Sequence, residues 1–235
     1  VSGSGSVYLY ELTGSTWNFV QRLTPDSFTN GHFGSSISIH ETRAVIGAPD
    51  ETGSGTGRVY VYDKLAGTWS RTTRFRSDDP VTGDLIGNDV AVYFDTIIAG
   101  AENKSTSQGA VYYFKYNGVS WSQSQKIVDP NPRDGDYFGR SVALEANVLA
   151  IGENRRDQTD PATAGQGRLL HVYTRTDLTA ASWTLLTSVS PGEASFLDNG
   201  IGTATAISDT TIVTTSPYDP TTKTDKEIAY NINLS

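Results

Sequence analysis

The loop at residues 129–136 carries the residues best suited to binding a metal ion. Its sequence, DPNPRDGD, places Asp129, Asn131, Asp134 and Asp136 around one glycine. Carboxylate and amide oxygens are the ligands that Ca²⁺ prefers in proteins. The spacing is one residue off a usual calcium loop and an arginine lies inside it, so the other interpretation is a solvated turn in which Asp136 caps the next strand. We expect no cofactor, with Ca²⁺ in this loop as the alternative.

Residues suited to catalysis are few. The patterns around the three histidines place His32 in a loop, His40 in a turn on the opposite face and His171 in a strand, so the three should not converge. The chain has no cysteine nucleophile and no G-x-S-x-G elbow. Acids are common in the loops, including Asp78, Asp79 and Asp84, and acidic residues gathered in solvated loops usually serve solubility. The sequence therefore predicts a protein that is not an enzyme, with a glycoside hydrolase using two loop carboxylates as a remote alternative.

A repeat of about fifty residues organises the whole chain. Tryptophans lie at positions 17, 69, 121 and 183, spaced by 52, 52 and 62 residues, and Phe-Gly or Ile-Gly pairs begin at 33, 86, 138 and 201. Each period holds four short strand patterns, which is typical of a β-propeller blade. We predict an all-β propeller of four-stranded antiparallel blades, about 4.5 repeats of about 52 residues. One domain spans 1–235, comprising a half blade at 1–30 and repeats at 31–83, 84–135, 136–196 and 197–235.

Composition narrows the class of partner. The 235 residues carry a net charge of −8 and contain no apolar run long enough to cross a bilayer. So acidic a surface would repel nucleic acid, and we expect neither a nucleic-acid partner nor a membrane span. The chain begins at Val1 without methionine, which we interpret as removal of an N-terminal segment such as a secretory signal. The sequons at Asn103 and Asn233 are candidate glycosylation sites and agree with an extracellular or cell-surface location.

The first strand of each repeat has one face of small residues and one of large residues. Alternation places Gly34, Ser36 and Ser38 on one side and Ile37 with Ile39 on the other, and we expect small faces to pack against large ones between blades. Charged residues interrupt this pattern in two later repeats, at Asp89 and Arg140. We expect these two side chains to reach a water-filled central channel or each other, because an unpaired buried charge is costly.

Long connections should gather at one face of the disc. In an up-and-down sheet, the loop from second to third strand and the loop from fourth to next first strand emerge at the same end, and both are long here. Ligand candidates on this loop-rich face are Phe28, Asp50, Glu51, Asp78, Asp79, Glu102, Asp134, Tyr137, Glu153, Arg155, Arg156, Phe196 and Tyr218. We expect Glu102, Glu153, Arg155, Arg156, Asp134 and Tyr137 to be exposed there. The four tryptophans could stack on sugars, but packing between blades is the favoured interpretation.

The motifs resemble a known family. Phe33-Gly34 and Gly47-Ala48-Pro49, with the segment DYFGRSVA at 136–143, resemble the FG-GAP repeat family, distantly like the head of integrin α-subunits. The resemblance implies a β-propeller and extracellular adhesion or recognition. Integrin-type repeats bind calcium through a D-x-D-x-D-G loop between first and second strands, and those connections are too short here to contain it.

We therefore expect a non-catalytic recognition or adhesion module that binds a protein or carbohydrate through its loop-rich face. The alternative is a structural subunit that assembles head-to-tail by completing blades between chains, so that copies associate through their terminal strands. The pattern of residues 5–23 predicts two strands and that of residues 201–234 predicts three. These five strands are one more than a four-stranded blade can hold. The N-terminal pair should either cap an incomplete final blade or continue an assembly, because bare sheet edges recruit other strands.

Overall fold

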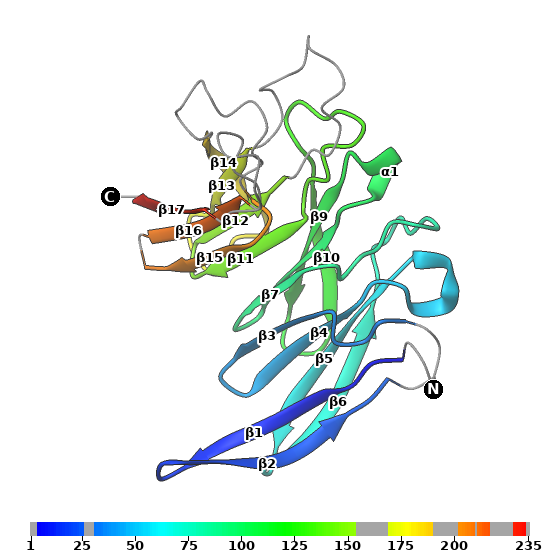
Figure 1. Ribbon diagram of the computed structural model, residues 1–235, viewed down its shortest axis with the longest axis vertical. Coiled ribbons are helices and arrows are strands. Elements are labelled where there is room, and N and C mark those ends of the chain that lie inside the picture. Colours follow the sequence, from blue (N-terminus) through cyan, green and yellow to red (C-terminus); the bar gives the residue numbers. More distant parts are fainter. Residues whose placement is uncertain are drawn as a thin grey trace.

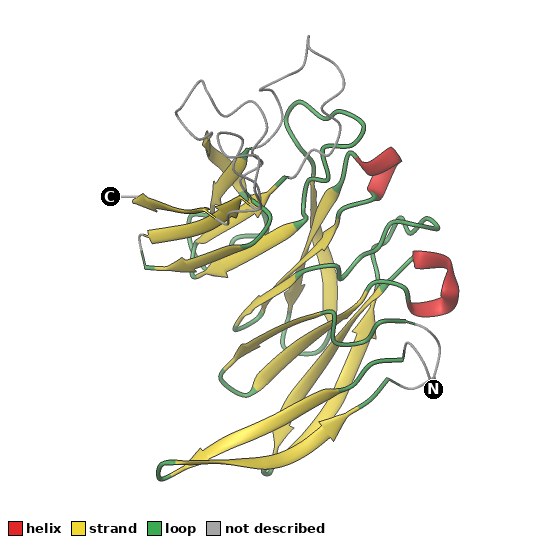
Figure 2. Cartoon of the chain, viewed as in Figure 1, coloured by secondary structure: helices red, strands yellow, loops and turns green. Residues whose placement is uncertain are grey.

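The structure is a computed structural model that describes residues 4–25, 31–153, 169–189, 202–209, 211–216 and 228–233. It is all-β, with antiparallel pairing throughout the described strands and two short helical turns (Figure 2). These turns are η1 (Glu51–Gly55) and α1 (Lys104–Ser107). The predicted fold class is confirmed at this level.

Three sheets have four strands each, joined in up-and-down order. Their strands are β3 (Ser36–His40), β4 (Arg43–Ala48), β5 (Arg58–Leu65) and β6 (Thr68–Phe75), then β7 (Val90–Tyr93), β8 (Thr96–Ala101), β9 (Ala110–Tyr116) and β10 (Trp121–Ile127), then β11 (Ser141–Glu145), β12 (Val148–Gly152), β13 (Leu170–Thr174) and β14 (Thr184–Val189). These sheets confirm the predicted four-stranded antiparallel repeat.

A smaller sheet lies at each end of the row. The N-terminal sheet contains β1 (Val7–Thr13) and β2 (Thr16–Leu23), and the C-terminal sheet contains β15 (Thr205–Ser208), β16 (Thr211–Ser216) and β17 (Ile228–Asn233). The five sheets follow chain order from the bottom to the upper left of Figure 1. Among the described strands, the N-terminal pair does not join the C-terminal sheet. The expected capping of a final blade is therefore not seen, because the two partial sheets lie at opposite ends of the row.

The hydrophobic core lies between successive sheets. Val45 and Val61 of the second sheet pack in one cluster with Ile97 and Tyr112 of the third, and each is fully buried. Further clusters fill the other three spaces between neighbouring sheets. Each sheet is too small to bury both of its own faces, so the fold depends on stacking.

Two glycines of the repeat motif meet across three of the four sheet boundaries. A Cβ at Gly47 would lie 2.0 Å from the carbonyl oxygen of Gly87, and a Cβ at Gly100 would lie 2.1 Å from that of Gly139. Real Cβ atoms do not approach this closely, so only glycine allows the backbones to touch. The Gly-Ala motif of one repeat thus packs on the Phe/Ile-Gly motif of the next.

Polar side chains join the first strands of neighbouring sheets. The Asp89 carboxylate accepts hydrogen bonds from the backbone N–H groups of Val142 (2.7 Å) and Val90 (3.0 Å). Arg140 instead pairs with Glu102, at 2.6 Å. Asp89 and Arg140 therefore do not pair with each other, because each finds another partner in the neighbouring chain segments. That either side chain reaches a central channel stays a prediction.

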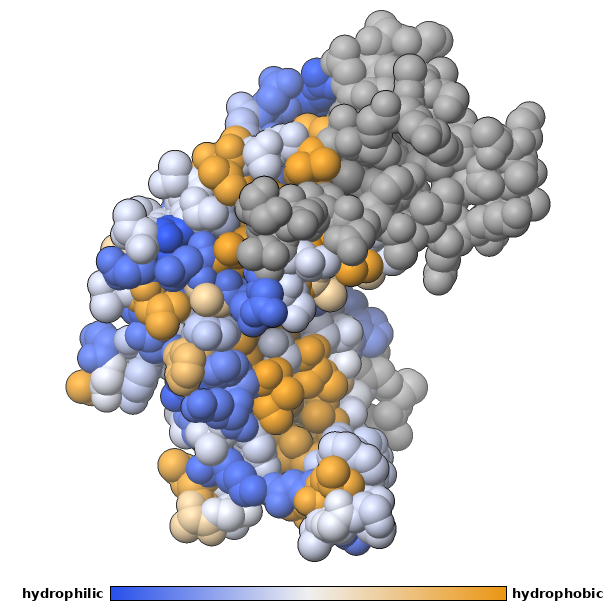
Figure 3. All heavy atoms as spheres, turned by 90° about the vertical axis from the view of Figure 1, so that its left-hand side faces the viewer, coloured by the Kyte–Doolittle hydropathy of each residue, from blue (hydrophilic) through white to orange (hydrophobic). Residues whose placement is uncertain are grey.

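The large face of β3 is uncovered, contrary to the expected packing. Ile37 and Ile39 are 53% and 57% exposed, whereas Val90 and Val92, their equivalents in β7, are 4% and 5% exposed. The reason is that β1 and β2 correspond to third and fourth strands, so no first strand precedes β3 among the described residues. The side of the molecule seen in Figure 3 shows hydrophobic side chains gathered in its lower half, which holds β1–β6.

Candidate binding face

The long connections of the repeats meet at one end of the sheets, as predicted. Backbone N–H groups of Gly83 and Leu85 donate to the carbonyls of Ser54 (2.9 Å) and Gly55 (2.8 Å). In the next repeat Tyr137 N–H donates to the Ser107 carbonyl at 2.8 Å. Both helical turns lie on this side in Figures 1 and 2, and the tight β3–β4 and β7–β8 turns lie on the other. We call this end the loop-rich face.

Exposed and half-buried side chains from the predicted set lie on the loop-rich face. Asp78 and Asp134 are exposed, and hydrogen bonds from Thr106 and Gln108 hold the pKa of Asp134 below its usual value. Asp50 is half-buried, with its Oδ2 2.5 Å from His32 Nδ1. Two more half-buried members are Glu102, paired with Arg140, and Tyr137.

Several predicted residues lie outside the part of the chain that the structure describes. These are Phe28, Arg155, Arg156, Phe196 and Tyr218. Of the two sequons, Asn103 is half-buried next to α1, while the side chain of Asn233 lies outside the description. Their assignment remains a prediction.

Three acids predicted in the solvated loops are buried instead. Glu51, Asp84 and Glu153 are 3%, 3% and 1% exposed. A buried carboxylate needs a hydrogen-bonding or charged partner, and each finds one on neighbouring strands or loops. The expectation that Glu153 is exposed is wrong, because the carboxylate turns inward onto β13.

The first acidic cluster comprises Glu51, Tyr60, Arg58 and Arg74. The Tyr60 hydroxyl donates to Glu51 Oε2 at 2.5 Å, and Glu51 Oε1 lies 3.1 Å from Arg74 and 3.2 Å from Arg58. Burial, followed by the hydrogen bond to Glu51, raises the pKa of Tyr60 to about 12. Two cations thus neutralise one carboxylate.

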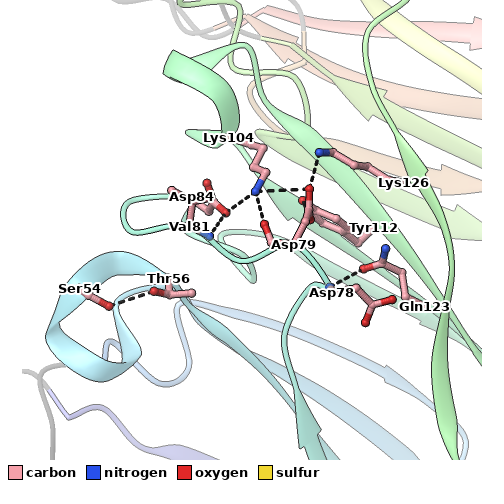
Figure 4. A network of polar contacts seen from close by, with 10 residues as sticks. All are labelled: Ser54, Thr56, Asp78, Asp79, Val81, Asp84, Lys104, Tyr112, Gln123 and Lys126. Carbon is pink, nitrogen blue, oxygen red and sulfur yellow. Dashed lines mark hydrogen bonds and ion pairs between the residues drawn. The ribbon is translucent and has the colours of Figure 1, made fainter.

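The second acidic cluster comprises Asp79, Asp84, Tyr112, Lys104 and Lys126 (Figure 4). Lys104 Nζ lies 2.7 Å from Asp84 and 3.5 Å from Asp79, and Lys126 Nζ lies 2.6 Å from Asp79. Tyr112 donates to Asp79 at 2.7 Å. Burial acts to raise the pKa of Asp79, but the bonds from Lys126 and Tyr112 outweigh it and the pKa is lowered. Two cations again match two carboxylates.

The third acidic cluster comprises Asp129, Glu153, His171 and Ser188. His171 Nε2 lies 3.1 Å from Glu153 Oε2, and Nδ1 lies 2.9 Å from the Ser188 hydroxyl. Asp129, Glu153 and His171 are 6%, 1% and 1% exposed. Burial raises the pKa of Glu153 against the opposing effect of His171. The ion pair described in this cluster joins Glu153 to His171.

The calcium ligand set expected at 129–136 is not assembled. Asp129 turns into the third acidic cluster, while Asn131 and Asp134 are exposed. Asp136 Oδ2 accepts from the Arg133 backbone N–H at 2.7 Å, as in a capped turn. The turn interpretation therefore describes this loop better than the calcium interpretation.

The three clusters occupy one repeated position that the sequence analysis missed. Tyr60, Tyr112 and His171 stand at equivalent points of β5, β9 and β13, since each follows the residue that pairs with the strand glycine Gly47, Gly100 or Gly152. The residue that pairs with each of them lies five positions after a tryptophan; these residues are Arg74, Lys126 and Ser188. A cation five residues after the tryptophan, as at Arg74 and Lys126, is a feature of the sequence that indicates this repeated position.

The tryptophans are mainly packing residues. Trp69 and Trp183 are 5% and 3% exposed. A glutamine side chain of the preceding sheet hydrogen-bonds to the backbone of each tryptophan, and Gln21 Nε2 donates to the Trp69 carbonyl at 2.8 Å. In the sheet that precedes Trp121, the position of this glutamine is occupied by Thr73, and a cavity of ≈ 250 Å³ opens beside it. Its lining includes Trp121, Tyr116 and Asp63. Trp17 is 67% exposed, and it lies in the first of the sheets that the structure describes.

The buried acids of the third acidic cluster do not suit glycoside hydrolysis. The ligand atoms of Asp129 and Glu153 lie within 4.8 Å of each other and both side chains are buried. Glycosidases place their two carboxyl groups about 5–9.5 Å apart on either side of an accessible bond. Solvent access and spacing both argue against this chemistry at this pair.

Comparison with known proteins agrees with the repeated architecture. A family model for the FG-GAP repeat matches residues 17–62 and 121–167. The chain carries FG-GAP repeats. Both matched segments begin at a tryptophan that opens or lies in a fourth strand and continue into the next sheet, so each FG-GAP match spans a junction between sheets. A search of curated proteins finds no match.

The FG-GAP repeat occurs in a broad class of proteins. FG-GAP repeats are found in adhesion and recognition modules, are typically extracellular and are generally non-catalytic. In the described part of the chain, no helix has the length and apolar character needed to span a membrane.

Proposed function

We propose that this chain is a non-catalytic extracellular module of β-propeller type that recognises a macromolecular partner through its loop-rich face. The observation that carries the proposal is the joining of successive loops by backbone hydrogen bonds, such as Leu85 to Gly55 and Tyr137 to Ser107. Loops held in this way form one preorganised surface across several repeats. Such a surface loses little conformational entropy on binding.

The charge of the loop-rich face favours a protein partner with basic groups. Asp78 and Asp134 are exposed there, and the chain has a net charge of −8. Complementary charge raises the rate of encounter and suppresses wrong partners. A carbohydrate partner is the alternative; Trp121, Tyr116 and Asp63 would then offer a stacking surface and a hydrogen-bond acceptor at their cavity.

A charge swap on each face tests the proposal. Labelled chain should bind cultured cells, and Asp78→Lys should weaken that binding several-fold because it reverses a charge on the loop-rich face. Glu41→Lys is the matched control, since Glu41 is an exposed acid in the tight β3–β4 turn at the other end. Equal binding by all three proteins, or a greater loss with Glu41→Lys, would contradict the assignment of the face.

A second candidate function is assembly between copies of the chain. The exposure of Ile37 and Ile39, whose β7 equivalents are buried, favours it. A first strand from another copy, such as β15, would cover this face as β3 covers that of β7. Sedimentation velocity should then show association that Ile39→Lys reduces and Val119→Lys, at a separate exposed position, leaves intact. A wild-type chain that stays monomeric over the micromolar range would exclude this candidate.

A further inference from the structure

We propose that Asp129, Glu153 and His171 form a binding site for one Zn²⁺ ion inside the stack of sheets. The site is distinct from the exposed residues of the loop-rich face, so it does not rest on the proposed recognition function. It combines two oxygen ligands with one nitrogen ligand, and zinc accepts imidazole and carboxylate together.

The ligand atoms already converge. One atom from each of the three side chains lies within 4.8 Å of the others, and His171 Nε2 lies 3.1 Å from Glu153 Oε2. Zinc ligands at about 2.1 Å in a tetrahedron lie about 3.4 Å apart. Small rotations of the carboxylates would therefore complete the geometry without movement of the strands.

The surrounding hydrogen bonds orient two of the ligands. His171 Nδ1 lies 2.9 Å from the Ser188 hydroxyl, which can accept a hydrogen bond from Nδ1–H and so leave the Nε2 lone pair directed at the site. Metal-binding histidines commonly hold their second nitrogen in this way. Asp129 Oδ1 accepts from the Asn131 backbone N–H at 3.0 Å, which fixes the carboxylate.

The internal repeats show that a positive charge is expected at this position. Glu51 is paired with two arginines in the first acidic cluster, and Asp79 and Asp84 with two lysines in the second. In the third cluster Ser188 replaces the cation and His171 replaces the tyrosine. With both carboxylates ionised, as metal ligands are, and the imidazole neutral, the buried site would carry two negative charges, which is costly without a cation. A divalent ion bound beside Ser188 would supply positive charge at the position that Arg74 and Lys126 occupy in the other two clusters.

The test uses the full chain, stripped with a chelator, and Zn²⁺ alone. Calorimetric titration should show one ion per chain, and Zn²⁺ at 100 times its Kd should raise the melting temperature by about 5–10 °C. Asp129→Asn and Glu153→Gln should weaken binding by at least about tenfold, in line with losses seen when metal sites are altered. Asp134→Asn is the matched control, because this exposed acid comes from the same loop and should leave binding unchanged.

A charge replacement guards against variants that fail to fold. Ser188→Lys should place an ammonium group where Lys126 lies in the second cluster, so it should abolish Zn²⁺ binding while raising the melting temperature of the metal-free chain. Absence of stoichiometric binding by the wild-type chain would overturn the proposal. So would binding that Asp129→Asn, Glu153→Gln and Ser188→Lys all leave intact, because the ion would then lie elsewhere.

Discussion

At the scale of single residues, Asp89 makes the stability of the fold depend on pH. Burial raises its pKa from 3.8 to about 6, against the opposing hydrogen bonds from the backbone N–H groups of Val142 and Val90. Between these two pH values the folded chain binds more protons than the unfolded chain, so the contribution is complete below pH 3.8 and is lost as pH rises through about 6.

We therefore expect the free energy of unfolding to fall by on the order of 2–3 kcal/mol from this group as pH rises from about 4 to about 7. Asp89→Asn should remove this component of the slope, since asparagine does not titrate. Urea unfolding across that range measures it, with Asp78→Asn as an exposed control. A wild-type slope in Asp89→Asn would show that another group is responsible.

Residue roles were only partly predictable from the sequence. Burial of Glu51, Asp84 and Glu153 was missed because acids in a loop look solvated unless their partners on other strands are known. The partners Arg74 and Lys126 lie five residues after their tryptophans, but only strand pairing shows that they face the acids. The burial of these acids therefore depends on long-range strand pairing, which local composition does not indicate.

At the scale of elements, the tight turns between first and second strands carry backbone strain. Ala146 joins β11 to β12 with φ of 48°, and Phe94 and Glu41 hold φ of 50° and 51° in the equivalent turns. A left-handed conformation costs a residue with a Cβ about 1–2 kcal/mol, and glycine avoids this cost.

Ala146→Gly should therefore raise the free energy of unfolding by about 0.5–1 kcal/mol, after the greater entropy of glycine in the unfolded chain is subtracted. Chemical denaturation provides the measurement. Ala66→Gly, at φ of 48° in the β5–β6 turn, offers a parallel test at an equivalent backbone conformation. Destabilisation by both changes would mean that the turns are not strained.

The elements themselves were the most predictable part of the fold. Alternation and the fifty-residue period indicated strand type and order, because both depend on local sequence and its repetition. The packing of Gly47 on Gly87 explains why the motif recurs. The exposure of Ile37 and Ile39 was not foreseen, since it depends on which strand precedes β3 in space.

At the scale of the whole molecule, the sheets form one row whose two sides differ. One side carries tight turns and the other carries the joined loops with Asp78 and Asp134 exposed. The central claim is that the second side contacts the partner. A reagent that labels only carboxyl groups can report this contact directly, because exposed acids lie on both sides of the row.

Carboxyl footprinting of the chain bound to cells, read by mass spectrometry, is the most direct measurement. We expect a carbodiimide label to react less with Asp78 and Asp134 in bound chain than in free chain, and equally with Glu41 in both. Protection of Glu41 with unchanged labelling of Asp78 and Asp134 would contradict the account, because it would place the partner on the side of the tight turns.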